Sequence, residues 1–172
     1  MTRFIWKEEQ VPSHLTVKQV YAIAFTDDKR VILQGENDKY NLTGGKPKMN
    51  ETYIETLKRE YYEELNIIID DIYYLGYLLV CEPNAKTYAQ VRMIAKIKSI
   101  GENRPDLDNG KLYKRFLVNL DNTKKYLNYK GKAGNLLIDS AIKMANEKYK
   151  FGCVNTSEDF IWKCNNSYLV FC

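Results

Sequence analysis

The sequence predicts a single domain of the α/β class, and three observations support this expectation. The chain has 172 residues, of which 45% are hydrophobic and 28% charged, which is typical of one domain with a full core. Several segments are rich in the β-branched and aromatic residues that strands favour. Two other segments, 52–65 and 134–149, carry apolar residues at helical spacing. Strands and helices together are typical of an α/β fold.

The first strand is expected over residues 17–26, VKQVYAIAFT, because this run is apolar and rich in β-branched and aromatic residues. The polar turn DDKR then leads to residues 31–34, VILQ, which we expect to be its hairpin partner. Residues 35–50 contain Gly, Pro and Asn throughout, so they are expected to form a long loop.

The helix expected over residues 52–65 has sequence signals at both ends. Thr52 and Glu55 have the spacing of a capping box, in which each side chain bonds the backbone amide of the other residue. Asn66 follows where helices often end in the left-handed conformation, which Gly adopts best and Asn next. The apolar stripe expected to face the core is Ile54, Leu57, Tyr61 and Leu65.

Two strands are expected after this helix, over residues 71–82 and 87–100. In the second, alternation predicts an apolar face and a polar face. The apolar face comprises Ala89, Val91, Met93, Ala95 and Ile97, and the polar face comprises Gln90, Arg92, Lys96 and Lys98. The remaining expected elements are a polar loop, a strand, a short helix and an amphipathic helix, over residues 101–110, 112–120, 122–129 and 134–149.

The chain changes character near Tyr149. We expect residues 1–149 to form the main domain and 150–172 to form an extension without an assigned role, packed on that domain. The extension contains three of the four cysteines, which are Cys81, Cys153, Cys164 and Cys172. Their spacing matches no zinc pattern and no dense disulfide framework, so free thiols in a reducing cytoplasm are expected.

Composition argues against several functional classes. The net charge of +4 comes without a concentrated basic arm, so charge alone does not indicate a nucleic-acid partner. The N-terminus lacks the features of a secretory signal, and no apolar run approaches the roughly 20 residues of a membrane span, so a cytoplasmic protein is expected. His14 is the only histidine, which argues against a His-rich metal site and a Ser-His-Asp mechanism.

Three carboxylates crowd into little more than one turn of the expected helix: Glu60, Glu63 and Glu64. Like charges three or four residues apart destabilise a helix. Either this face is simply solvated, or a positive group lies among the carboxylates. Hard divalent cations such as Mg²⁺ bind a few carboxylates together with substrate phosphates, so this spacing is suited to a metal site.

The segment 44–67, GGKPKMNETYIETLKREYYEELNI, resembles the signature of the Nudix hydrolase superfamily. Its fixed positions, separated by five, seven and two residues, are Gly45, Glu51, the pair Arg59 and Glu60, the pair Glu63 and Glu64, and a closing apolar Ile67. Asn66 stands where the family usually has Gly, and it tolerates the same backbone conformation. The resemblance implies an α/β/α sandwich with a mixed sheet between helices, extending over residues 1–149.

The resemblance also implies a reaction and its machinery. The reaction would be hydrolysis, dependent on Mg²⁺ or Mn²⁺, of a phosphoanhydride bond in a nucleoside diphosphate linked to another group. Glu60, Glu63 and Glu64 match the metal-binding and catalytic glutamates, and the backbone carbonyl of Gly45 would complete the metal shell. Structural support would come from Gly44, Glu51 and Arg59.

Other residues are candidates outside this segment or next to it. A general base on a late loop is common in the family; Glu102 is the first candidate, followed by Asp106 and Asp108. Arg92, Lys46 and Lys48 are cations that could contact substrate phosphates, or they are ordinary surface cations.

The substrate is left open by the sequence. A nucleoside triphosphate is expected first on general grounds, and an ADP-ribose-type substrate next, because Pro83 lies where ADP-ribose hydrolases have a marker proline, although a turn proline explains it as well. A non-catalytic nucleotide sensor would usually have lost its glutamates, and a hydrolase of RNA 5′ ends would need a basic track. A small-molecule nucleotide is therefore the expected partner, and a homodimer, common in the family, stays open.

Overall fold

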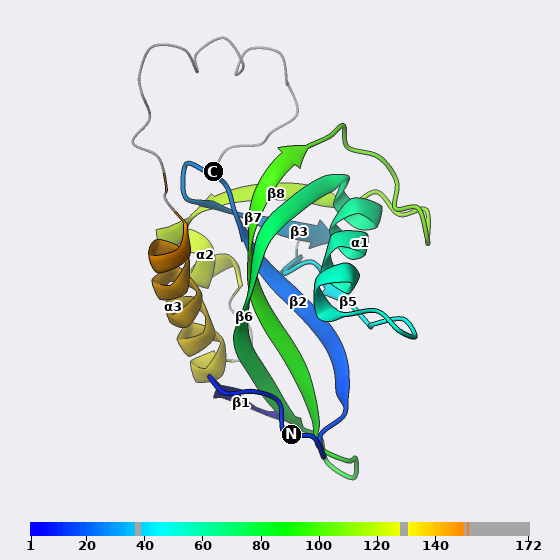
Figure 1. Cartoon of the computed structure of the whole chain (residues 1–172), viewed down its shortest axis with the longest axis vertical. Coiled ribbons are helices and arrows are strands. Elements are labelled where there is room, and N and C mark those ends of the chain that lie inside the picture. Colours follow the sequence, from blue (N-terminus) through cyan, green and yellow to red (C-terminus); the bar gives the residue numbers. More distant parts are fainter. Residues whose placement is uncertain (37–38, 128–130, 150, 152–172) are drawn as a thin grey trace.

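The computed structural model describes residues 1–36, 39–127, 131–149 and 151. The elements in chain order are β1 (Arg3–Lys7), β2 (Val17–Phe25), β3 (Arg30–Glu36), β4 (Lys39–Asn41), β5 (Gly44–Gly45), α1 (Tyr53–Leu65), β6 (Ile67–Cys81), β7 (Tyr88–Ile100), β8 (Lys114–Asn119), α2 (Leu120–Tyr126) and α3 (Gly131–Lys148) (Figure 1). The described helices include none that is long and apolar enough to span a bilayer.

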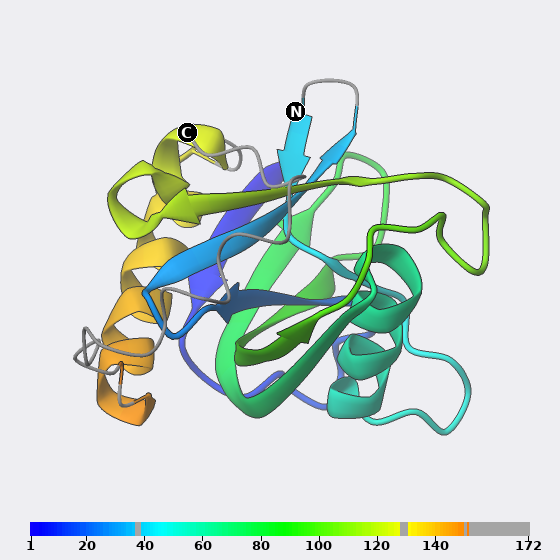
Figure 2. The same ribbon diagram turned by 90° about the horizontal axis from the view of Figure 1, so that it is seen from above.

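The strands form one 8-stranded mixed sheet with the order β1-β6-β7-β2-β3-β4, in which β5 also pairs with β2 and β8 with β3. β2 and β7 run parallel, whereas β6 and β7, and β3 and β8, pair antiparallel. Helix α1 lies on one side of the strands, and α2 and α3 lie on the other (Figures 1 and 2). The predicted α/β/α sandwich is confirmed.

The core consists of two apolar clusters, one on each side of the sheet. On one side, α1 contributes buried Leu57, Tyr61 and Leu65, which pack with residues of β2, β6 and β7. On the other side, α3 contributes Leu137, Ile138, Ala141 and Ala145. Because the burial of apolar surface drives this packing, it fixes the positions of α1 and α3 relative to the strands.

Both predicted ends of α1 are confirmed. The Thr52 hydroxyl accepts from the Glu55 amide at 3.2 Å, and the Glu55 carboxylate accepts from the Thr52 amide at 2.8 Å. Asn66 has φ 48° and ψ 46°, which is the left-handed conformation. The predicted apolar stripe is wrong at Ile54, which is 42% exposed. Thr56 is buried instead, because its hydroxyl donates to the Thr52 carbonyl at 3.0 Å and so needs no water.

Three strand predictions need correction. Strand β1 was not expected, and it extends the sheet by pairing with β6. The segment 35–50, expected to be a loop, contains β4 and β5, which are too short to give a periodic pattern. Strand β6 begins at Ile67, earlier than expected, because residues 67–70 already pair with β7, although the register shifts between Ile68 and Ile69 and again after Asp70.

The predicted polar face of β7 is wrong for Gln90 and Arg92, which are only 7% and 1% exposed. Strand β7 is central in the sheet and contributes residues to the apolar clusters on both sides of it, so both of its faces are covered over most of its length. Lys98, near the end of the strand, is exposed as expected. The predicted extension 150–172 lies outside the described residues, except for Phe151, and so do Cys153, Cys164 and Cys172.

Candidate active site

The two glycines of β5 allow a close approach that other residues would prevent. A Cβ on Gly44, whose φ is 152°, would lie 2.1 Å from the carbonyl oxygen of Val20. A Cβ on Gly45 would lie 2.2 Å from Oε1 of Glu60. Because neither Cβ is present, β5 pairs closely with β2, and the Glu60 carboxylate lies directly against the backbone of Gly45.

The positive group among the crowded carboxylates is Arg59. Its Nε lies 2.6 Å from Oε1 of Glu51 and its Nη2 lies 2.9 Å from Oε2, which is a bidentate ion pair. Its Nη1 donates to Glu60 at 2.7 Å and to Glu63 at 3.0 Å. Glu51 in turn accepts from the backbone amide of Lys48 at 2.9 Å. Arg59 therefore ties the loop before α1 to two of the three crowded glutamates.

The ionisation of these groups follows from their partners. Hydrogen bonds from Arg59 lower the pKa of Glu51 to about 2, against a smaller opposing effect of burial. Burial raises the pKa of Glu60, although Arg59 opposes the shift. The hydrogen bond to Glu51 raises the pKa of Arg59, which stays charged.

Glu64 is the least satisfied of the three glutamates. Its Oε2 is buried and has no hydrogen-bond partner among the described residues. Burial, followed by the nearby charge of Glu60, raises the pKa of Glu64 to about 8, and a hydrogen bond from Gln34 only partly offsets this. A buried carboxylate without a full set of partners is costly unless it is protonated or meets a cation.

The residues present are suited to a hard divalent cation. Carboxylates on one helical face and the backbone carbonyl of Gly45 are the oxygen donors that Mg²⁺ and Mn²⁺ prefer. Oε2 of Glu64, which has no hydrogen-bond partner among the described residues, is an oxygen atom that remains available as a metal ligand. Within the described ranges no three acidic, Cys or His side chains converge closely enough to enclose a metal ion. Arg59 accounts for part of this spacing, because it holds Glu60 and Glu63 by hydrogen bonds.

A cleft of about 320 Å³ adjoins the carboxylates. Strands β2 and β3 pair only at Phe25 and Val31 and then diverge, and the cleft is lined by residues on both of them. It is lined by Tyr21, Gln34, Glu36, Asn41, Leu42, Gly44, Glu64, Gln90, Arg92 and Tyr113. Of the three crowded glutamates only Glu64 lines this cleft, so the glutamate cluster of α1 meets the cleft at that residue.

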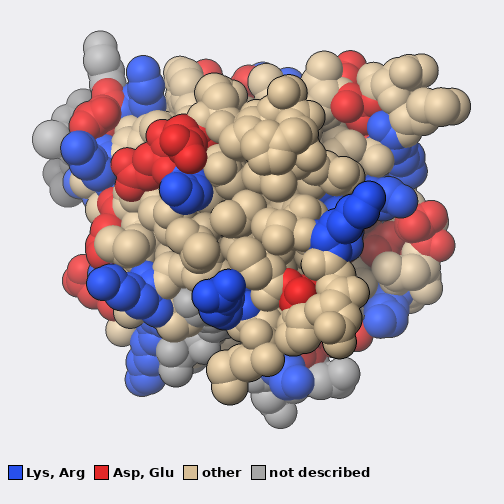
Figure 3. Space-filling view, turned by 90° about the horizontal axis from the view of Figure 1, so that it is seen from below, with Lys and Arg blue, Asp and Glu red and all other residues tan. Residues whose placement is uncertain are grey.

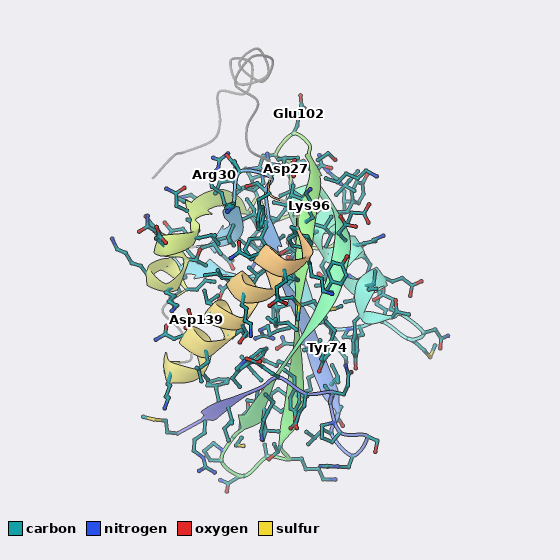
Figure 4. All side chains as sticks on the ribbon, turned by 60° about the vertical axis from the view of Figure 1, so that its left-hand side comes forward. Asp27, Arg30, Tyr74, Lys96, Glu102 and Asp139 are labelled. Atoms are coloured by element: carbon teal, nitrogen blue, oxygen red, sulfur yellow. The ribbon has the colours of Figure 1, made fainter. Side chains whose placement is uncertain are left out.

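The other candidate residues occupy different places. Glu102 lies at the start of the loop after β7, where its side chain is exposed and points away from the molecule (Figure 4). Asp106, in the same loop, is 4% exposed, and its charge contributes to the raised pKa of Glu64, after burial and Glu60. Lys46 is exposed, and Nζ of Lys48 lies 4.0 Å from Glu63. Of these cationic and late-loop acidic candidates, only Arg92 lines the cleft.

Several cleft residues were not anticipated from the sequence. They are Tyr21, Gln34, Asn41 and Tyr113. They come from β2, β3, β4 and the segment before β8, and no spacing in the sequence links them. Their only signal in the sequence is their residue type, polar or aromatic, which is too common to single them out.

Comparison with known proteins relates this chain to a protein family. A sequence model of the NUDIX domain matches residues 16–128. No curated protein sequence matches the chain. Solved structures that are similar include the Bacillus subtilis pyrophosphohydrolase BsRppH, which is 19% identical, with 85% of this chain and 93% of that chain covered and a TM-score of 0.65.

Two further solved structures are similar. A MutT structure, from work on the Aliivibrio salmonicida and Vibrio cholerae proteins, is 14% identical, with 74% of this chain and 96% of that chain covered and a TM-score of 0.54. A NUDIX hydrolase from Nitrosomonas europaea is 21% identical, with 78% and 92% covered and a TM-score of 0.54. At these identities, the structural likeness establishes a shared fold.

Proposed function

Since this chain belongs to the NUDIX domain family and is a hydrolase that acts on pyrophosphate bonds, we propose that it hydrolyses a phosphoanhydride bond in a nucleoside diphosphate linked to another group. A nucleoside triphosphate is the first candidate, and the reaction depends on Mg²⁺ or Mn²⁺. The observation that carries this proposal is the position of Glu64, which is one of the three crowded glutamates of α1 and also lines the cleft.

Glu60, Glu63 and Glu64, with the carbonyl of Gly45, would hold the divalent cation. When bound, it would neutralise charge on the substrate phosphates and lower the pKa of the attacking water. Arg59, itself anchored by Glu51, limits the repulsion among these carboxylates in the free protein. Lys46 and Lys48 lie in the loop that follows β5, and Nζ of Lys48 is 4.0 Å from Glu63, one of the proposed metal ligands.

Water attacks phosphorus directly in this proposal, and no covalent intermediate with the protein forms. A side chain must accept the proton of the attacking water. Glu60 is one candidate, because it is half-buried and lies against Gly45. Glu102 and Asp106 are candidates from outside α1, and the burial of Asp106 near Glu64 supports it over the exposed Glu102.

The observations bear differently on the alternative substrates. Pro83 lies exposed in the turn between β6 and β7 and does not line the cleft, which weakens its use as a marker of an ADP-ribose-type substrate. On the face shown in Figure 3, Lys and Arg side chains are dispersed among uncharged and acidic ones. That arrangement offers little support there for a basic track suited to RNA. The similar Bacillus subtilis protein is a pyrophosphohydrolase, which agrees with hydrolysis of a phosphoanhydride bond.

The test is a panel of nucleoside di- and triphosphates, ADP-ribose and dinucleoside polyphosphates, incubated with Mg²⁺ or Mn²⁺ while product release is followed. Glu63→Gln should abolish turnover of the compound that the wild type hydrolyses. Glu147→Gln, which changes an exposed glutamate on α3, is the matched control and should retain it. Nucleotide binding that depends on the cation but gives no turnover with any compound would contradict the proposal and favour a nucleotide sensor.

A further inference from the structure

Arg92 is a buried charge without a charged partner. Only 1% of it is exposed, and it is the largest of the fully buried side chains in the described part of the chain. It forms no ion pair with any described residue. Burial of a charge is costly unless other groups compensate it, so a ligand group that accepts hydrogen bonds would offset part of this cost.

The surroundings of Arg92 hold its guanidinium in one orientation. Nη1 donates to the Val91 carbonyl at 3.0 Å, and Nη2 donates to Oε1 of Gln90 at 3.0 Å. The guanidinium carbon lies 4.6 Å from the ring centroid of Tyr21, which is a cation–π arrangement. Gln90 is itself fixed, because its Nε2 donates to Gln19 at 2.6 Å. Nε of Arg92 is the atom left without a partner.

Arg92 lines the cleft together with groups suited to a nucleobase. Two aromatic residues line it, Tyr21 on β2 and Tyr113 before β8, and two amide residues line it as well, Gln34 and Asn41. Of the three crowded glutamates, Glu64 lines the cleft, and Glu60 and Glu63 do not. A nucleotide whose phosphates lie at the carboxylates would therefore direct the rest of the molecule into this cleft.

We propose that this cleft is a nucleobase subsite and that Arg92 selects a 6-oxopurine, the base class of guanine. This inference depends on the proposed function only in taking the ligand to be a nucleotide. A guanidinium has donors and no acceptor. The O6 and N7 atoms of guanine are two adjacent acceptors that match a guanidinium, whereas adenine places an amino donor at the first of these positions. Gln90 is a positioning residue, because its amide is occupied by Arg92 and Gln19.

The first experiment compares ligands on the unaltered protein. Equilibrium binding of GMP, IMP, AMP and 7-deaza-GMP is measured by calorimetry; these monophosphates contain no phosphoanhydride bond, so the result is independent of turnover. GMP and IMP, which carry O6 and N7, should bind about 10-fold to 100-fold more tightly than AMP, because a good bidentate contact discriminates by this much. 7-Deaza-GMP, which lacks N7, should lie between them.

The second experiment changes the guanidinium and keeps its charge. Arg92→Lys should remove most of the preference for GMP over AMP, because an ammonium lacks the planar fork. Arg104→Lys is the matched control: Arg104 also lies over a tyrosine ring, at 4.7 Å from that of Tyr62, but it does not line the cleft. Its preference should equal that of the wild type. If Arg92→Lys does not fold, the ligand comparison on the wild type decides alone.

Equal affinity for GMP and AMP in the wild type would overturn the inference. Equal weakening of both ligands in Arg92→Lys would also overturn it, because it would assign Arg92 to a phosphate. The two proposals fail separately. Selective GMP binding by a protein that hydrolyses no nucleotide would leave the subsite in place and refute the proposed reaction. Turnover of GTP and ATP at equal kcat/KM, with equal binding of GMP and AMP, would do the reverse.

Discussion

Arg59 and Glu51 form a bidentate ion pair, with Nε–Oε1 and Nη2–Oε2 distances of 2.6 and 2.9 Å. Glu51 precedes α1 and Arg59 lies within it, so the pair fixes the loop to the helix. The remaining nitrogen of Arg59 reaches Glu60 and Glu63. Arg59 therefore braces the loop and also determines where the side chains of two proposed metal ligands lie.

The first prediction concerns this brace. Glu51→Gln should lower kcat/KM by about 10-fold to 100-fold, as loss of a group that orients metal ligands commonly does. The reason is that Arg59, released from Glu51, would bind Glu60 and Glu63 more strongly and compete with the cation. Titration with Mg²⁺ should show a higher half-saturating concentration, and excess Mg²⁺ should restore part of the activity.

The control for Glu51→Gln is Asp28→Asn, which weakens another arginine–carboxylate pair, Asp28 with Arg30, away from the proposed site. Its activity and Mg²⁺ requirement should be those of the wild type. An unchanged Mg²⁺ requirement in Glu51→Gln would contradict the role assigned to the brace.

The second prediction is a dependence of stability on pH. Arg59 lowers the pKa of Glu51 to about 2, below its ordinary value of 4.5. A lowered pKa stabilises the folded state above the unfolded pKa, and this contribution is lost as the pH falls from about 4.5 towards 2. Between pH 6 and pH 3, urea unfolding should therefore show the wild type losing about 1 kcal/mol more than Glu51→Gln, a modest value because solvent screens the pair. Parallel pH profiles of the two proteins would refute it.

The third prediction concerns Asn66, which stands where the family usually has Gly. Asn66→Ala should lower the free energy of unfolding by about 1 to 2 kcal/mol, because alanine is strained at φ 48°. It also loses the bond from Nδ2 to the Glu102 carbonyl at 2.9 Å. Asn66→Gly also loses this hydrogen bond, but glycine is not strained at this φ. Its free energy of unfolding should therefore lie between those of the wild type and Asn66→Ala. Guanidinium unfolding of the three proteins measures this, and equal stability of the Ala and Gly variants would contradict it.

The fourth prediction separates two carboxylates of one loop. Glu102→Gln should change kcat/KM by no more than about 2-fold, as expected for an exposed substitution. Asp106→Asn should lower it by about 10-fold or more, since buried Asp106 lies near Glu64 and organises the loop by accepting from the Asp108 amide and the Asn109 side chain, both at 2.7 Å. A loss of 100-fold or more in Glu102→Gln would instead identify Glu102 as the general base.

Local signals in the sequence predicted the local structure well. The capping box at Thr52 and the left-handed Asn66 are confirmed, because both depend on residues within one turn of each other. The polar face expected on β7 is wrong at Gln90 and Arg92, because alternation reports which residues differ along a strand and not what covers each face. Strand β1 was missed, because its pairing with β6 joins distant parts of the chain.

The sequence by itself determined the family of the chain and the carboxylate spacing on α1, since helical periodicity alone places Glu60, Glu63 and Glu64 together. Only the tertiary structure decided what surrounds them. It placed Arg59 between Glu51 and two of these glutamates, buried Glu64 at the cleft, and brought Tyr21, Gln34 and Arg92 together from three strands. The physical reason is that sheet order and divergence, which depend on packing across the whole chain, determine which side chains share a cleft and how deeply a charge is buried.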